Sequence, residues 1–102
     1  MIQDIYIIDN TESMLNVLNQ IFKNDVDYQF RSVKTEELEL ALKNIPDMII
    51  IDEDTVNVDI IDLCKNIRAN EDNSITPIVV ISSNWDKEHR IKILEESIEY
   101  FI

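Results

Sequence analysis

Short strand-like runs that alternate with segments of helical spacing constrain the fold of this chain more than any other feature. Strands are expected at residues 5–8, 28–33, 48–51, 78–81 and 98–102. Helices are expected between them, at residues 11–22, 35–45, 59–69 and 84–97. Strands that alternate with helices are joined by right-handed crossovers. The sequence therefore predicts one doubly wound α/β domain, a parallel sheet with helices on both faces.

Charge and composition exclude several classes of function. Nine Lys and Arg against 21 Asp and Glu give a net charge of −12, which argues against binding nucleic acid or an anionic membrane. The chain has no glycine, so it has no dinucleotide-binding loop, P-loop or nucleophile elbow. Cys64 is the one cysteine, which excludes an internal disulfide and a multi-cysteine zinc site. No apolar run approaches the ~20 residues of a membrane span, so a cytoplasmic domain is expected.

Polar residues follow three of the expected strands. They are Asp9-Asn10 after the first, Asp52-Glu53-Asp54 after the third and Ser82-Ser83 after the fourth. Ligands of open parallel sheets bind at the carboxyl ends of the strands, where these residues converge if the strands are neighbours. Clustered carboxylates raise a pKa or recruit a cation, and oxygen ligands suit Mg²⁺. A carboxylate beside Mg²⁺ can act as a nucleophile toward a phosphoryl group.

Four segments resemble the receiver domain of response regulators. They are residues 46–52 (PDMIIID), 63–68 (LCKNIR), 76–82 (TPIVVIS) and 99–101 (EYF). The resemblance covers residues 1–102 and implies a flavodoxin-like, five-stranded sheet in the order 2-1-3-4-5. The family's fifth helix is lacking, so the chain is expected to be a receiver domain truncated after its fifth strand. One apolar face of the sheet is then expected to be partly uncovered.

The resemblance also implies the roles of individual residues. Asp52 is the expected phosphoacceptor, supplied by a histidine kinase or a phosphotransfer protein. Asp9, Asn10, Asp52 and the backbone carbonyl of Asp54 are the expected Mg²⁺ ligands. Ser82 and Tyr100 are the expected switch residues. Asn10 stands where the family has an acid, so weaker Mg²⁺ binding is expected. The domain acts on itself, so no catalytic residue is expected and it is not expected to be an enzyme.

Each of these residues also has a simpler structural interpretation. Asp52 and Asp54 can be solvated loop acids, and Asp9-Asn10 can be a turn that leads into a helix cap. Ser83 with Asp86 matches a capping box. Tyr100 can be a half-buried strand residue, Cys64 a core residue and His89 a surface residue. An EF-hand loop that begins at Asp52 is excluded, because Asn57 and Leu63 occupy its sixth and twelfth positions.

Two functions from different classes stay open. The first is phosphorelay to a C-terminal output domain absent from this chain; the region of residues 64–76 resembles receivers attached to diguanylate cyclases. The second is a degenerate pseudo-receiver that binds proteins or forms a homodimer through the uncovered face, without phosphorylation. A flavodoxin-like cofactor binder shares the fold class, but the chain lacks a Ser/Thr/Gly-rich phosphate loop after its first strand.

Overall fold

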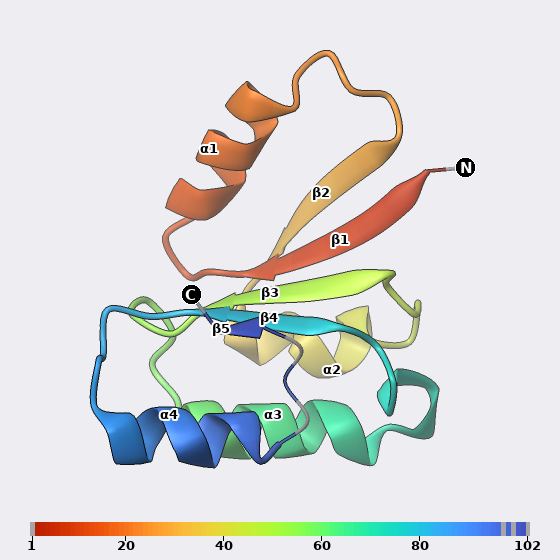
Figure 1. Ribbon diagram of the computed structural model, residues 1–102. Helices are drawn as coiled ribbons and strands as arrows, with labels where there is room; N and C mark the ends of the chain where they lie inside the picture. The colour runs from red at the N-terminus through yellow and green to blue at the C-terminus, as the bar shows by residue number, and fades with distance from the viewer. Residues whose placement is uncertain (1, 97, 99, 102) are drawn as a thin grey trace.

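The structure is a computed structural model that describes residues 2–96, 98, 100 and 101, the last two by their backbone alone. Its elements alternate as the sequence predicts (Figure 1). The strands are β1 (Gln3–Ile8), β2 (Tyr28–Val33), β3 (Met48–Asp52), β4 (Ile78–Ile81) and β5 (Tyr100–Phe101). The helices are α1 (Ser13–Ile21), α2 (Leu38–Ala41), α3 (Ile60–Ala69) and α4 (Lys87–Leu94). Two 3-10 turns, η1 (Thr35–Glu37) and η2 (Glu71–Asn73), complete the described elements.

The strands form a parallel sheet in the order β2-β1-β3-β4, which confirms the predicted doubly wound topology for these four strands. At the β4 edge, the backbone of the short segment β5 pairs with Val79 and Val80. Two residues of the predicted strand at 98–102 thus pair with the sheet, and residues 99 and 102 lie outside the described part of the chain. A full fifth strand stays a prediction.

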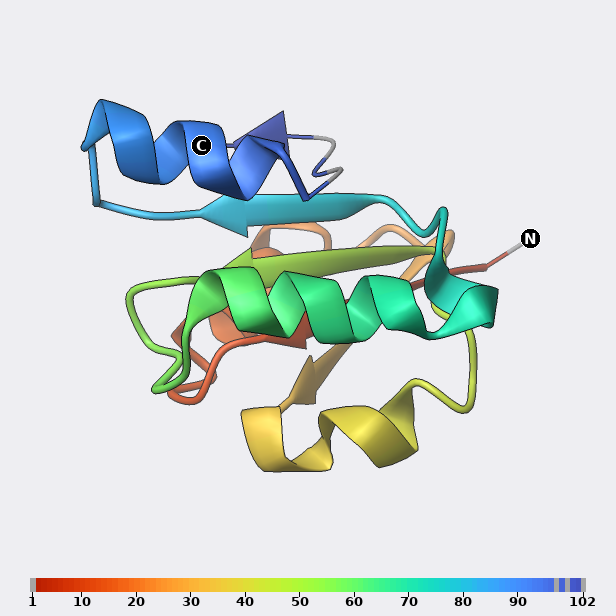
Figure 2. The ribbon, with the colours of Figure 1, turned by 90° about the horizontal axis from the view of Figure 1, so that it is seen from below.

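The main core lies between the sheet and the three helices α2, α3 and α4, which cover the same face (Figures 1 and 2). Side chains alternate across a strand, so every second residue of each strand faces this core. Ile49 and Ile51 of β3 and Ile78 and Val80 of β4 are fully buried there. This alternation of the pleated backbone fixes which residues face the helices, and the β-branched residues of β3 and β4 suit such a surface.

The opposite face of the sheet carries α1 alone among the described helices (Figure 1). The β3 and β4 residues on this face, such as Ile50 and Val79, are only half-buried. No residue of α1 is fully buried, and Ile21 is 66% exposed. The described residues therefore leave this face partly uncovered, as the sequence predicts.

Helix ends are where the sequence prediction was wrong. The helix expected at 35–45 is the turn η1 followed by the short helix α2, which ends at Ala41. The hydroxyl of buried Tyr6 donates to the carbonyls of Ala41 (3.0 Å) and Asn44 (3.1 Å), so a core contact holds the end of α2. The fourth helix begins at Lys87 rather than at 84, because Asp86 caps it by accepting from the His89 N–H. No helix in the described part of the chain is long and apolar enough to cross a bilayer.

Candidate functional site

The carboxyl ends of β1, β3 and β4 lie side by side, at the same edge of the sheet (Figure 1). Ile8 pairs with Ile51, so Asp9 and Asp52 take the next position on neighbouring strands. Asp52 in turn pairs with Ile81, which Ser82 follows. We call this edge, with Asp9, Asp52, Asp54 and Ser82, the carboxyl edge.

The Asp9 side chain is fully buried and tightly held. One carboxylate oxygen accepts from the Thr11 N–H (2.8 Å) and hydroxyl (2.7 Å). The other accepts from the Met14 N–H (2.8 Å), in the first turn of α1. Burial alone would raise the pKa of Asp9, but these bonds and one from the Thr55 hydroxyl together lower it. Asp9 therefore stays ionised and accepts from N–H groups of the turn that leads into α1 and of its first turn.

The turn between Asp9 and α1 is strained at Glu12. Its φ of 61° lies in the left-handed region, and it is the one non-glycine residue with positive φ in the described chain. This conformation costs an ordinary residue about 1 kcal/mol, and the chain has no glycine to relieve it. The bonds to Asp9 hold the turn in place.

Asp52 ends β3 beside these groups. Its side chain is half-buried and accepts one hydrogen bond, from the Asp54 N–H (3.1 Å). Burial raises the pKa of Asp52, and the negative charges of Asp9 and Asp54 raise it further, against the lowering effect of that bond. The carboxylates of the carboxyl edge thus interact electrostatically, which is the condition for attracting a cation.

Asn10 does not point its amide at Asp52. Its Nδ2 lies 3.4 Å from both the Thr55 carbonyl and the Asn57 Oδ1, and its Oδ1 accepts from the Thr35 N–H (3.3 Å). The side chain thus joins the loops that follow β1, β2 and β3. Among the described residues, no three His, Cys, Asp or Glu side chains form a ready metal-ligand group.

The loop after β4 meets the loop after β3 through Asp54. The Asp54 carboxylate accepts from the Ser83 N–H (3.1 Å) and the Ser83 hydroxyl (3.0 Å). The nearly buried Ser82 hydroxyl accepts from the Asn84 N–H (3.0 Å). Ser83 therefore contacts Asp54 and does not cap α4. The side chain of Tyr100, the other expected switch residue, lies outside what the structure describes.

Comparison with known proteins settles the family. The family model of the response regulator receiver domain matches residues 5–102. The chain belongs to this family. The comparison with curated proteins found no significant match to this chain.

Solved receiver domains share the fold at low sequence identity. The Vibrio cholerae chemotaxis protein CheY4 superposes with a TM-score of 0.84 at 16% identity, over 100% of this chain and 86% of that one. A receiver domain from a Syntrophus aciditrophicus histidine kinase gives a TM-score of 0.80 at 24% identity, over 98% and 76%. The magnesium-bound receiver domain of the Pseudomonas aeruginosa sensor kinase PA1611 gives 0.78 at 18% identity, over 100% and 84%.

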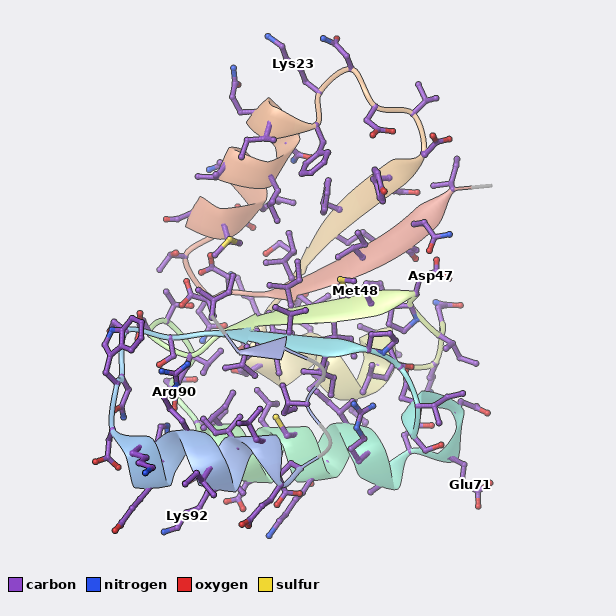
Figure 3. All side chains as sticks on the ribbon, in the orientation of Figure 1. Lys23, Asp47, Met48, Glu71, Arg90 and Lys92 are labelled. Carbon is purple, nitrogen blue, oxygen red and sulfur yellow. The ribbon has the colours of Figure 1, made fainter. Side chains whose placement is uncertain are left out.

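The first acid of the segment at 46–52 lies far from the carboxyl edge of this receiver domain. Figure 3 labels Asp47 and Met48 at the opposite, amino end of β3. The Asp47 carboxylate accepts from the Asp4 N–H at 2.7 Å and so joins β3 to β1 at that end. Asp47 is thus a control for Asp52, since Asp47 directly precedes β3 and Asp52 is its last residue.

Sequence reasoning missed one contact of the receiver domain, between Glu53 and His89. The His89 Nε2 lies 2.5 Å from a Glu53 carboxylate oxygen, and their side chains are 25% and 15% exposed. The other carboxylate oxygen of Glu53 is buried without a hydrogen-bond partner among the described residues. The expectation of a surface His89 was therefore wrong. The alternation of side chains along β3 was the one signal in the sequence, because it predicts that Glu53, two residues after Ile51, faces the helices.

Proposed function

We propose that this receiver domain accepts a phosphoryl group on Asp52 from the phosphohistidine of a histidine kinase or a phosphotransfer protein. The observation that carries the proposal is the position of Asp52: it lies next to Asp9 at the ends of the neighbouring strands β3 and β1, and it accepts from the Asp54 N–H. A carboxylate in such a cluster favours a cation that also attracts phosphate. Receiver domains generally act as signalling modules of two-component systems and not as enzymes, and we propose the same here.

The transfer needs one nucleophile and one leaving group. An Asp52 carboxylate oxygen forms the new bond to phosphorus while the phosphorus–nitrogen bond of the donor breaks. The electron pair of that bond returns to the imidazole nitrogen of the donor. Asp9, held by Thr11 and Met14, keeps its charge beside Asp52 throughout, because its hydrogen bonds favour the ionised form.

The residues at the carboxyl edge fit a Mg²⁺ ion that keeps most of its water. Asp52 has free lone pairs, and Asp9 has few left after accepting from Thr11 and Met14. Mg²⁺ sites in proteins often use only one or two carboxylates. A bound Mg²⁺ would offset the carboxylate charge and bind an oxygen of the phosphoryl group. We propose that Asn10 contributes little to Mg²⁺ binding, because its side-chain amide contacts Thr35, Thr55 and Asn57 instead.

A phosphoryl group on Asp52 carries about two negative charges and replaces the single charge of the carboxylate, so the site beside the loop after β4 gains about one negative charge. Ser82 is the proposed hydroxyl donor to it, with Tyr100 as the aromatic that follows its movement. The Ser83 N–H is already bound by the Asp54 carboxylate, so a phosphoryl oxygen has to compete with an internal anion for this donor. The resulting change at α4 is the proposed signal to a C-terminal output domain, such as a diguanylate cyclase, in the cytoplasm.

The direction of the Asn10 amide favours a second candidate function, a pseudo-receiver that binds proteins without phosphorylation. In that case Asp9 and Asp52 are structural, and the partly uncovered face with α1 carries the interaction. A Mg²⁺ titration separates the two functions. Binding at about millimolar concentration or tighter that Asp52→Asn abolishes excludes the pseudo-receiver, whereas no binding excludes the phosphoacceptor.

Beryllofluoride, a mimic of the acyl-phosphate group, tests the proposed function directly. We expect MgCl₂ with beryllofluoride to shift the amide NMR signals of Ser82, Ser83 and Asn84. Asp52→Asn should abolish these shifts, whereas Asp47→Asn, the same change at the other end of β3, should retain them. Unchanged spectra of the wild type, or equal shifts in Asp52→Asn, contradict the proposal.

A further inference from the structure

A groove of about 730 Å³ is lined by residues of α2 and α3. These two helices cover the same face of the sheet as α4 (Figure 2). One wall comes from η1 and α2, and the other from the start and outer side of α3. Leu38, Leu42 and Leu63 form its apolar floor and are almost fully buried. At its rim, Val58 is 46% exposed. We call it the α2–α3 groove.

Both walls of the α2–α3 groove carry negative charge. Glu36 and Glu39 lie on the α2 wall, and Asp59 and Asp62 lie on the α3 wall. No Lys, Arg or His is among the described residues that line it. Glu36, Glu39 and Asp62 form no ion pair with any residue in the described part of the chain. Three carboxylates of the groove, Glu36, Glu39 and Asp62, are therefore without a counter-charge in the described part of the chain, whereas the fourth, Asp59, caps the start of α3 by accepting from the N–H groups of Ile61 and Asp62.

The α3 wall is long enough to contact a docked helix. Asp62, Asn66 and Ala69 recur at intervals of three and four residues, so they form one stripe along α3, and all three are exposed. From Asp59 to Ala69 the wall is roughly 15 Å long, the length of nearly three helical turns. Helices with apolar anchors at this spacing commonly dock in such grooves.

The charge of the α2–α3 groove selects the kind of occupant. Nucleic acid and anionic lipid are repelled by its four carboxylates. A metal ion is not favoured, because the carboxylates are divided between two walls. A chain with apolar side chains on one face and Lys or Arg beside them complements both the floor and the rims.

We propose that the α2–α3 groove docks a basic amphipathic helix of a partner protein. Leucine-sized side chains of that helix contact Leu38, Leu42 and Leu63. Its Lys or Arg side chains pair with Glu39 on one wall and Asp62 on the other. This inference does not depend on phosphorylation of Asp52, so either proposal can fail alone. Because its charge pairs lie at exposed rims, the binding is sensitive to salt.

A designed peptide tests the docking surface. The probe is a fluorescein-labelled helix of leucine and lysine, with leucine at i, i+3, i+4 and i+7 spacing, added to the full chain and followed by anisotropy. The groove variant is Glu39→Gln with Asp62→Asn. The matched control is Glu88→Gln with Asp27→Asn, which removes two exposed charges outside the groove.

We expect saturable binding that the groove variant weakens by about tenfold or more, which corresponds to the loss of two charge pairs. The control pair should change the affinity by less than about twofold, and a leucine–glutamate peptide should not bind. Amide NMR signals of Asn66 and Ala69 should shift on binding. No saturable binding, or equal weakening by both double variants, overturns the proposal, because the second result indicates attraction to net charge alone. Thermal unfolding of both double variants verifies that each is folded.

Discussion

The buried Asp9 carboxylate gives a prediction whose magnitude follows from its contacts. In Asp9→Asn one carboxylate oxygen becomes an NH₂ group, which cannot accept a hydrogen bond. The remaining oxygen can serve either the Met14 N–H or the two Thr11 donors, but not both sides at once. At least one charge-assisted hydrogen bond, worth about 1.5–3 kcal/mol, is lost. The favourable interaction of the charge with the start of α1, about 0.3–1 kcal/mol, is lost with it.

Relief of repulsion at Asp52 offsets part of this loss, so the net cost of Asp9→Asn is about 1–3 kcal/mol. For a domain of this size that lowers the Tm by roughly 5–20 °C. Urea unfolding followed by circular dichroism measures it, with the exposed Asp72→Asn as the control for charge, expected to change stability by less than about 0.5 kcal/mol.

The pH dependence of the Asp9→Asn effect has a definite sign. Because the folded-state pKa of Asp9 is lowered, its contribution is complete above the ordinary value of 3.8 and is lost as the pH falls through the folded value. The difference in free energy of unfolding between the wild type and Asp9→Asn should therefore disappear in acid. Equal stability of the two proteins at pH 7, or a gap that persists in acid while both are folded, refutes the reasoning.

Three further predictions concern neighbouring groups. The pKa of Asp52, measured by carbon NMR, should fall in Asp9→Asn, because the negative charge of Asp9 raises it. Since the folded-state pKa of Asp52 is raised, its ionised form destabilises the fold, and Asp52→Asn should raise the midpoint of urea unfolding at pH 7. This gain in stability should vanish as the pH falls below 3.8. His89→Ala should lower the free energy of unfolding by about 1–3 kcal/mol, because it leaves the Glu53 carboxylate unpaired, and adding Glu53→Gln should restore part of this free energy. If the losses of the two single variants simply add in the double variant, the two side chains are not coupled and the pairing is contradicted. Glu12→Asn should raise the Tm by several degrees, since Asn tolerates the left-handed conformation, and a lower Tm counts against strain at this turn.

The carboxyl edge was predictable because strand ends are visible in a sequence. The apolar runs before Asp9, Asp52 and Ser82 each end at a polar residue, and parallel strands bring such ends to one edge. The order of the four strands followed from the resemblance to receiver domains, because hydrophobic periodicity does not encode which strands are neighbours.

Side-chain directions in the loops were not predictable in the same way. Asn10 contacts Thr35 and Asn57, which are distant in sequence and meet only when the loops after β2 and β3 are in place. The pairing of Glu53 with His89 likewise depends on how α4 packs against the sheet. Such contacts are decided by tertiary packing, for which a single sequence gives no local signal.

Chemical mapping of the phosphoryl group tests the central claim most directly. The full chain is incubated with acetyl phosphate and MgCl₂, the acyl phosphate is trapped by reduction with borohydride, and the modified residue is located by peptide mass spectrometry. The account predicts modification of Asp52 in the wild type and in Asp47→Asn, and none in Asp52→Asn. Modification at another residue, or an unmodified Asp52 in a folded wild type, contradicts it.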